Sequence, residues 1–338
     1  MALATPPLRE DLHVVCDWLE LAVLVDEYYT YSFENLARAW DVSRNREDRD
    51  PEDGDDTDES FIESVKSEIL QRIDVLDDAY PFSLSESGES LEFDRGTCSV
   101  GGYVYLLCLL LSHPKAGPIF SGNYLPPINN AVRDFFQVSA TLAAAGYFAG
   151  NSYSFGFPRP DHTGFLEKLR IVYAHFGENV EVVAAVPAGA SAHQKDAQID
   201  VIAWASPKDG AAGKPYLLGQ VASGADWTAK TIKGGPIDSF HHVWFTRSPA
   251  SMASPALFVP ICYGDLCDGS NNDRVGIQCY EFGTIFYRFR VPIYAQKGFE
   301  LAAAANDGLI VERANDIEGI RAWISDQITK IREASVAA

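Results

Sequence analysis

Two apolar, strand-like runs near the middle of the chain each carry one polar residue where an apolar residue is expected. The runs are QIDVIAWA, which contains Asp200, and YLLGQVASG, which contains Gln220. A short connection rich in Gly, Pro and Lys separates them, and this pattern is typical of two adjacent strands joined as a hairpin. Because adjacent strands bring residues at their matching ends together, we expect both polar groups at one end of a sheet.

A lone carboxylate in a strand that otherwise buries itself needs a partner. Asp200 lies between Ile199 and Val201, and burying its charge without a metal or hydrogen-bond donors would be strongly destabilising. Gln220 offers a neutral carbonyl oxygen, and oxygen ligands are those that Mg²⁺ prefers. The pair therefore predicts a divalent-metal site, with a buried Asp–Gln pair of purely structural meaning as the alternative.

The order of the predicted elements and these residues resemble the PD-(D/E)XK nuclease superfamily, which has the restriction-endonuclease-like fold. In that family an αβββαβ core carries an Asp on one central strand and, on the next, a Glu or Gln followed after one residue by a Lys. QIDVIAW matches the first of these strands and YLLGQVA matches the second, over roughly residues 160–265. The resemblance implies an α/β (α+β) fold with a mixed sheet flanked by helices, Mg²⁺ or Mn²⁺ as cofactor, and DNA as substrate.

The resemblance also implies a set of metal ligands. Asp200 and Gln220 belong to it, and superfamily members often add an acidic residue from the first helix, a role that Glu167 in GFLEKLR can play. Metal-dependent hydrolysis needs oxygen ligands, a group that orients the attacking water, and positive charge. For Glu167 the alternative is an ordinary exposed helical glutamate paired with Lys168 or Arg170.

The lysine of the family motif is displaced in this chain. The position two residues after Gln220 holds Ala222. Lys230, where the following helix is expected to begin, is the first candidate to replace the missing lysine, and Lys233, one turn later on the same face, is the second. Lys233 and Arg159 are also candidates for binding nucleic acid, although Arg159 is equally consistent with a loop arginine in a local ion pair.

The first 150 residues predict a helical, acidic region that binds a partner or has a structural role. Amphipathic or apolar patterns predict helices at residues 9–41 (two helices), 60–80, 101–114 and 128–149. Ser60 and Glu63 form a capping-box pattern at the head of the second of these segments. No catalytic signature is present in this part of the chain.

Residues 151–338 predict the nuclease domain. The expected order is a helix, three strands in succession, a helical segment, a further strand and a C-terminal helix, at residues 163–177, 180–186, 198–205, 215–224, 226–245, 256–264 and 316–334. His241 and His242 lie in the helical segment, and consecutive histidines do not share a helix face. They are therefore interpreted as surface or core residues.

The chain is acidic, but its charge is unevenly distributed. The net charge is −20; residues 1–160 hold 11 Lys and Arg against 27 Asp and Glu, and residues 161–338 hold 16 against 20. Nine of the acidic residues lie between Glu47 and Glu59, in a run predicted to be a solvated or disordered loop, or alternatively a DNA-mimicking or partner-docking arm. Phosphate neutralisation drives non-specific DNA affinity, so we expect a protein partner or a homo-oligomer that brings the nuclease to DNA.

The remaining composition indicates a cytoplasmic protein. No run of eighteen or more apolar residues and no secretory signal is visible, so no membrane contact is expected. The six cysteines include no Cys-x-x-Cys pair, which favours free buried thiols over a structural zinc site. The leading hypothesis is a Mg²⁺-dependent DNA nuclease, an effector of a bacterial defence or restriction system. The alternative is a catalytically inactive scaffold subunit with the same fold.

Overall fold

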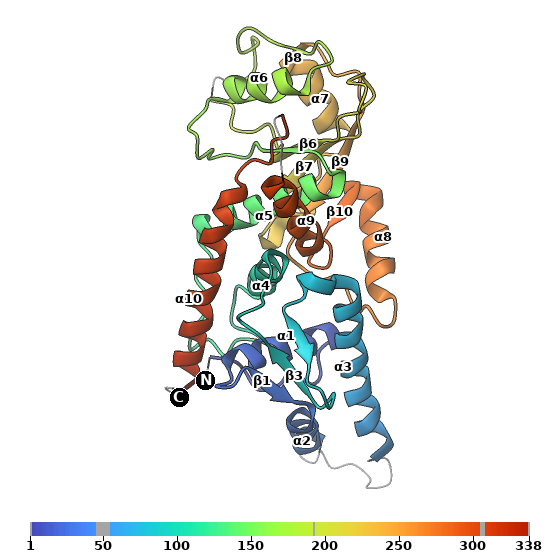
Figure 1. The fold of residues 1–338 in the computed structure, drawn as a ribbon, viewed down its shortest axis with the longest axis vertical. Helices are drawn as coiled ribbons and strands as arrows, with labels where there is room; N and C mark the ends of the chain where they lie inside the picture. Colours follow the sequence, from blue (N-terminus) through green and yellow to red (C-terminus); the bar gives the residue numbers. More distant parts are fainter. Residues whose placement is uncertain (1, 45–54, 192, 305–307, 337–338) are drawn as a thin grey trace. The chain divides into compact units, whose positions relative to one another are not determined.

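The computed structural model describes residues 2–44, 55–191, 193–304 and 308–336, and its chain divides into two compact units (Figure 1). Unit 1 comprises Met1–Val132, Ile261–Val275 and Glu318–Ala338, and unit 2 comprises Arg133–Pro260 and Gly276–Ile317. The units therefore alternate along the chain, whereas the sequence suggested one boundary near residue 150. The boundary near residue 150 was based on a change in amino-acid composition, whereas the two units are defined by which elements pack together.

Unit 1 is mainly helical, as the sequence predicted. Its elements are α1 (Leu12–Val25), β1 (Thr30–Ser32), α2 (Phe33–Arg44), α3 (Asp55–Leu76), the 3-10 helix η2 (Asp77–Ala79), β2 (Phe82–Leu84), β3 (Ser90–Phe93), α4 (Val100–Ser112) and most of α10 (Ile317–Val336). The three strands form an antiparallel sheet in the order β1-β3-β2.

The acidic run only partly matches its prediction. α3 begins at Asp55, so residues 55–59 are helical instead of forming a loop. The rest of the run, residues 47–54, lies outside the described residues.

Unit 2 is built around a mixed five-stranded sheet, which confirms the predicted α/β class. Its elements are most of α5 (Asn130–Phe148), β4 (Asn151–Ser154), α6 (Phe165–Phe176), β5 (Glu181–Val182), β6 (Val201–Trp204), β7 (Tyr216–Val221), the 3-10 helix η3 (Ala225–Ala229), α7 (Gly235–Trp244), β8 (Phe245–Arg247), β9 (Ala253–Phe258), the end of α8 (Ser270–Phe282), β10 (Thr284–Phe286), α9 (Val291–Ala303) and the 3-10 helix η4 (Ala314–Asp316). The sheet order is β10-β9-β7-β6-β4.

Strand directions in this sheet follow from its connections. β6 and β7 form the predicted antiparallel hairpin, and β4 pairs antiparallel with β6. β9 lies parallel to β7, and β10 lies parallel to β9. A parallel neighbour needs a crossover connection, and α7 lies in the connection between β7 and β9.

One of the three successive predicted strands forms only in part and lies outside the five-stranded sheet. The run over residues 180–186 contributes only β5, which pairs with β8 outside the five-stranded sheet. The sheet position beside β6 is taken by β4, whose sequence NSYS is too polar to suggest a buried strand. Its other edge is covered by backbone: Ser152 N donates to Ile310 O and Glu312 N donates to Ser152 O, both at 2.9 Å.

Helices cover both faces of the sheet (Figure 1). α6 and α7 lie on one face, and α5 and α9 lie on the other. The face toward α6 and α7 holds an apolar cluster in which Ile202, Trp204, Tyr216 and Leu218 from the hairpin are buried. These residues alternate along β6 and β7, as a strand with one face in the core requires.

The helical segment predicted over residues 226–245 is broken. η3 ends at Ala229, and α7 begins at Gly235 after Gly234, whose φ is 78°. Such a backbone conformation favours glycine and interrupts a helix.

The described part of the chain contains no helix that is long and apolar enough to cross a membrane.

Candidate functional site

Asp200 and Gln220 lie at the same end of the β6–β7 hairpin. The register pairs Val201 with Gly219, and Asp200 N donates to Gly219 O at 2.8 Å. Asp200 precedes Val201 and Gln220 follows Gly219, so the two predicted polar residues flank this pair at the same end of the hairpin, one on each strand.

The Asp200 residue is held by hydrogen bonds from three directions. Its Oδ2 accepts from Val221 N at 2.8 Å, and its backbone oxygen accepts from Phe155 N at 2.7 Å and Gly156 N at 3.1 Å. Gln137 Nε2 donates to the same backbone oxygen at 2.5 Å. These bonds fix the residue at the junction of β7, the segment after β4, and α5.

The electrostatic environment of Asp200 disfavours its charged form. Burial, with a smaller contribution from the charge of the nearby Asp196, raises the pKa of the carboxyl to about 7. The Val221 N–H and the charge of Lys230 act in the opposite direction, lowering this pKa. Since burial is the largest effect, a cation beside the carboxylate would stabilise the ionised form.

Gln220 has a polar atom without a partner. Its side chain is buried, and among the described residues its Oε1 accepts no hydrogen bond. Buried polar atoms are almost always paired in folded proteins, and leaving one unpaired costs roughly 1–3 kcal/mol. The Gln220 Oε1 atom is therefore available as a ligand to a metal ion.

Gln137 was missed by the sequence analysis. It comes from α5, and besides Asp200 its Nε2 contacts Ser154 Oγ at 3.4 Å. The only signal in the sequence is a single amide in the apolar stretch FFQVSATLAAA. The last two helices before the β6–β7 hairpin are α5 and α6. The sequence suggested α6 as the helix that contributes to the site, whereas the structure places a side chain of α5 at Asp200.

Glu167, the predicted ligand from α6, makes a different contact. It is exposed and accepts from Gly164 N at 3.3 Å, at the start of its own helix. Its predicted neighbour in an ion pair, Lys168, instead contacts Asp161 and Glu312. A role of Glu167 as a metal ligand stays a prediction.

The two candidate lysines differ in their contacts. Lys230 is exposed at the end of η3, and its charge lowers the pKa of Asp200. Lys233 Nζ donates to Tyr280 O at 2.7 Å. Ala222, at the position of the motif lysine, is buried and offers only a methyl group. Of the two lysines, Lys230 is therefore the one whose charge acts on Asp200.

Arg159 makes contacts with the backbone. It is buried, and its guanidinium donates to Thr163 O at 3.0 Å, Phe155 O at 3.0 Å and Lys195 O at 2.9 Å. Its direct partners are thus carbonyls, which makes it a positioning residue of the loop after β4. Nucleic-acid binding by Arg159 stays a prediction.

The residues at this site fit a hydrated Mg²⁺ in their chemistry. In the parts of the chain that the structure describes, no three His, Cys, Asp or Glu side chains gather as a metal-binding group. The set here has one carboxylate, Asp200, and the unpaired amide oxygen of Gln220. Mg²⁺ prefers oxygen ligands, retains several waters and is often bound through one or two carboxylates, so a sparse set of this kind suits it.

Gly156 leaves the space that the Asp200 carboxylate occupies. A Cβ atom at this position would lie 2.7 Å from Asp200 Oδ1 and 3.1 Å from Gln137 Oε1. Replacing Gly156 with alanine is therefore expected to turn the carboxylate and weaken Mg²⁺ binding by roughly 10- to 100-fold, as when a neighbour that orients a ligand is lost. The Mg²⁺ dependence of the thermal unfolding midpoint measures this effect.

Gly164 provides the matched control for that substitution. No atom lies within 4 Å of a Cβ built there, and its φ of −68° suits any residue. The Gly164→Ala protein should bind Mg²⁺ as the unaltered chain does. Equal Mg²⁺ responses of the Gly156→Ala protein and the unaltered chain would contradict the steric argument.

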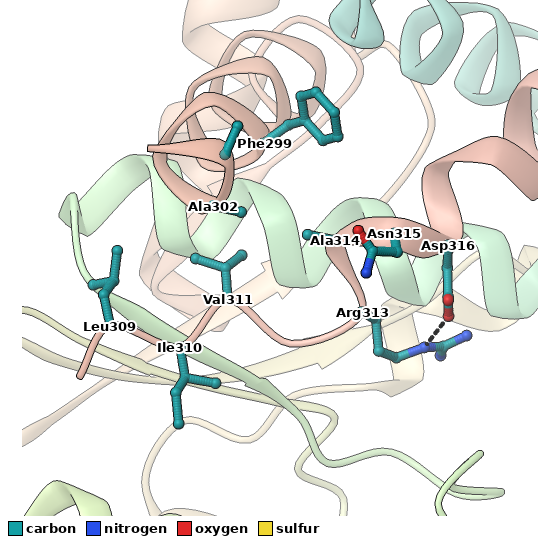
Figure 2. A pocket seen from close by; sticks show the side chains of 10 residues that line it. Phe299, Ala302, Leu309, Ile310, Val311, Arg313, Ala314, Asn315 and Asp316 are labelled. Atoms are coloured by element: carbon teal, nitrogen blue, oxygen red, sulfur yellow. Dashed lines mark hydrogen bonds and ion pairs between the residues drawn. The ribbon is translucent and has the colours of Figure 1, made fainter. Parts of the chain in front are cut away.

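A separate cavity of about 480 Å³ lies beside α9 (Figure 2). Its lining residues are Phe299, Ala302, Ala303, Leu309, Ile310, Val311, Arg313, Ala314, Asn315 and Asp316. Figure 2 shows the apolar side chains toward one end and the Arg313–Asp316 ion pair, at 2.8 Å, toward the other. None of the predicted site residues lines this cavity.

Comparison with known proteins gives no family for this chain. No protein-family model, no curated protein and no solved structure matches it.

Proposed function

We propose that the chain is a metal-dependent nuclease that hydrolyses phosphodiester bonds of DNA. The observation that supports this proposal most is the pair at the end of the β6–β7 hairpin. Asp200 presents a carboxylate there, and Gln220 presents a buried oxygen without a partner among the described residues. The resemblance of both strand sequences to the PD-(D/E)XK motif points to the same chemistry.

Each residue of the proposed site has a separate role. Asp200 and Gln220 hold the ion, and the Val221 N–H and the Gln137 amide keep Asp200 in place. Bound Mg²⁺ polarises the phosphoryl oxygen and lowers the pKa of a bound water. The ammonium of Lys230 supplies positive charge where negative charge develops on the phosphate.

Cleavage of supercoiled plasmid in Mg²⁺ or Mn²⁺ tests the proposal. The Asp200→Asn protein should cut at least about a thousandfold more slowly, because it loses several kcal/mol of metal-derived stabilisation. The Lys230→Met protein should lose about a hundredfold. Lys233→Met is the matched control, since Lys233 Nζ is bound to Tyr280 O.

Two outcomes would change the assignment. Cleavage that is unaffected by Asp200→Asn would show that the activity lies elsewhere. A larger loss for Lys233→Met than for Lys230→Met would exchange the roles of the two lysines.

The setting of the activity is a further part of the proposal. A net charge of −20 opposes binding to DNA without help, so we infer a protein partner or self-association that brings the nuclease to its substrate. The pairing of a nuclease-like unit with an acidic helical unit supports an effector of bacterial defence or restriction, by analogy of architecture. The cysteines are free thiols, which supports a reducing, cytoplasmic compartment.

The second candidate function is a catalytically inactive scaffold. Ala222 favours it, because the methyl group at the motif position is buried and cannot act as a cation. In that case the plasmid stays intact with every metal and with the partner present, whereas the nuclease requires cleavage that depends on Asp200.

A further inference from the structure

An aromatic ring lies at the surface next to the candidate site. Phe157 is 53% exposed, and it directly follows Gly156, whose Cβ position would lie 2.7 Å from Asp200 Oδ1. The residue that precedes Phe157 therefore lies next to the Asp200 side chain. A ring with this much exposed surface is accessible to a ligand.

The backbone around Phe157 is held firmly. Phe155 N and Gly156 N donate to Asp200 O at 2.7 and 3.1 Å on one side of the ring. On the other side, Arg159 is buried and donates to three backbone carbonyls, two of them in Phe155 and Lys195. Because the backbone is fixed on both sides of Phe157, binding a ligand to the ring does not require a loop to become ordered. The loss of conformational entropy on binding is therefore small.

Two cations stand near the ring. Lys195 Nζ lies 5.7 Å from the ring centroid, and the Arg159 guanidinium carbon lies 5.8 Å from it. Arg159 is buried, whereas Lys195 is exposed. The ring thus combines an accessible aromatic surface with a solvent-facing ammonium, the two features that bind a nucleobase and the phosphate beside it.

We propose that Phe157 and Lys195 form a stacking platform for an unpaired nucleobase next to the scissile phosphodiester. Its ligand is single-stranded DNA, or a duplex with a locally unpaired nucleotide. Bases inside a duplex are stacked on one another and offer no free face to the ring, whereas an unpaired base does. This inference rests on the proposed nuclease function, because it defines the substrate class of the same site.

Binding measured with a protein that cannot cut tests the platform. In the Asp200→Asn protein with Mg²⁺ present, fluorescence anisotropy compares a labelled single-stranded oligonucleotide with its duplex. Adding Phe157→Ala should weaken single-strand binding by about fivefold to a hundredfold, the effect of losing one stacked base, and leave duplex binding unchanged. Phe157→Trp should preserve the single-strand affinity, and Lys195→Met should weaken it and reduce its salt dependence.

Tyr280 supplies the matched control, because it is another exposed aromatic residue, 86% accessible. Tyr280→Ala should leave single-strand binding unchanged. Equal single-strand affinities with and without Phe157→Ala would overturn the platform, as would an equal loss for single strand and duplex.

The cleavage assay separates the two proposals. If cleavage depends on Asp200 but Phe157→Ala has no effect on single-strand binding or cutting, the platform is wrong and the nuclease stands. If the unaltered chain binds neither form of DNA and no cleavage depends on Asp200, both proposals fail.

Discussion

Replacing Asp200 with asparagine is expected to raise the free energy of unfolding at pH 8, without divalent cations, by up to about 4 kcal/mol, since each pKa unit corresponds to about 1.4 kcal/mol. The folded protein holds this carboxyl at a pKa of about 7, chiefly through burial, against an ordinary value of 3.8. Ionising it in the fold is therefore costly. Asparagine has nearly the same shape and carries no charge.

The direction of the pH dependence follows from the raised pKa. Between about pH 4 and 7 the folded protein keeps this proton and the unfolded chain has lost it, so the stability of the unaltered chain falls as pH rises through this window. Below about pH 4 both states are protonated, and the Asp200→Asn protein and the unaltered chain should converge. Urea unfolding in a chelator at pH 4, 6 and 8 measures the difference.

Mg²⁺ should narrow the difference in stability between the two proteins. An ion bound only to the folded state stabilises it by about 2.7 kcal/mol at a hundred times its dissociation constant, and this gain should be absent in the Asp200→Asn protein. Asp209 is the matched control, because it is an exposed aspartate that accepts from Ala211 N at 3.1 Å. Asp209→Asn should change neither the stability at pH 8 nor the Mg²⁺ response.

Two results would contradict this prediction. If Asp200→Asn is less stable than the unaltered chain at pH 8 in the chelator, burial of the charge is not the dominant effect on this carboxyl. If Mg²⁺ stabilises both proteins equally, the ion does not bind at Asp200.

The part of the candidate site that could be predicted from sequence is its local part. Asp200 and Gln220 lie at the same end of the hairpin because its register is set by the alternation of apolar residues in two neighbouring strands. A pattern that repeats every second residue is visible in any window of the sequence, so this placement could be inferred without the fold.

The rest of the site depends on contacts between segments far apart in sequence. Gln137 reaches Asp200 across 63 residues, and Gly156 is required by the position of Asp200 Oδ1. Neither residue belongs to a local pattern. The polar strand β4 likewise enters the sheet because its backbone is paired on both edges, and backbone pairing leaves little signal in the side chains.

Replacing Arg72 with methionine is expected to lower the free energy of unfolding of unit 1 by about 3–5 kcal/mol, the loss typical of removing one partner from a buried ion pair. Arg72 has no exposed surface, and its guanidinium contacts Asp17 at 3.0 Å, Glu20 at 2.7 Å and Glu68 at 3.2 Å. These carboxylates are at most 1% exposed. Without the arginine, three buried carboxylates lose the cation that they share.

An exposed arginine in a similar helical pair provides the control. Arg38 contacts Glu34, four residues earlier in α2, and both side chains are about 70% exposed. Surface pairs of this kind contribute about 0.3–0.5 kcal/mol, so Arg38→Met should have little effect on urea unfolding. Arg72→Lys keeps the charge but loses the planar geometry that serves several carboxylates, and its stability should lie between those of Arg72→Met and the unaltered chain.

The three proteins distinguish the charge of Arg72 from its shape. A loss for Arg72→Met as small as that for Arg38→Met would show that the carboxylates are satisfied by other donors, such as the hydroxyl groups of Tyr80 and Tyr105, which donate to Glu20 at 2.8 and 2.9 Å. A loss for Arg72→Lys equal to that for Arg72→Met would show that the geometry of the guanidinium matters more than its charge. The expected intermediate value for lysine requires both, because one ammonium can neutralise the cluster but cannot contact three carboxylates on α1 and α3 at once, as the guanidinium does.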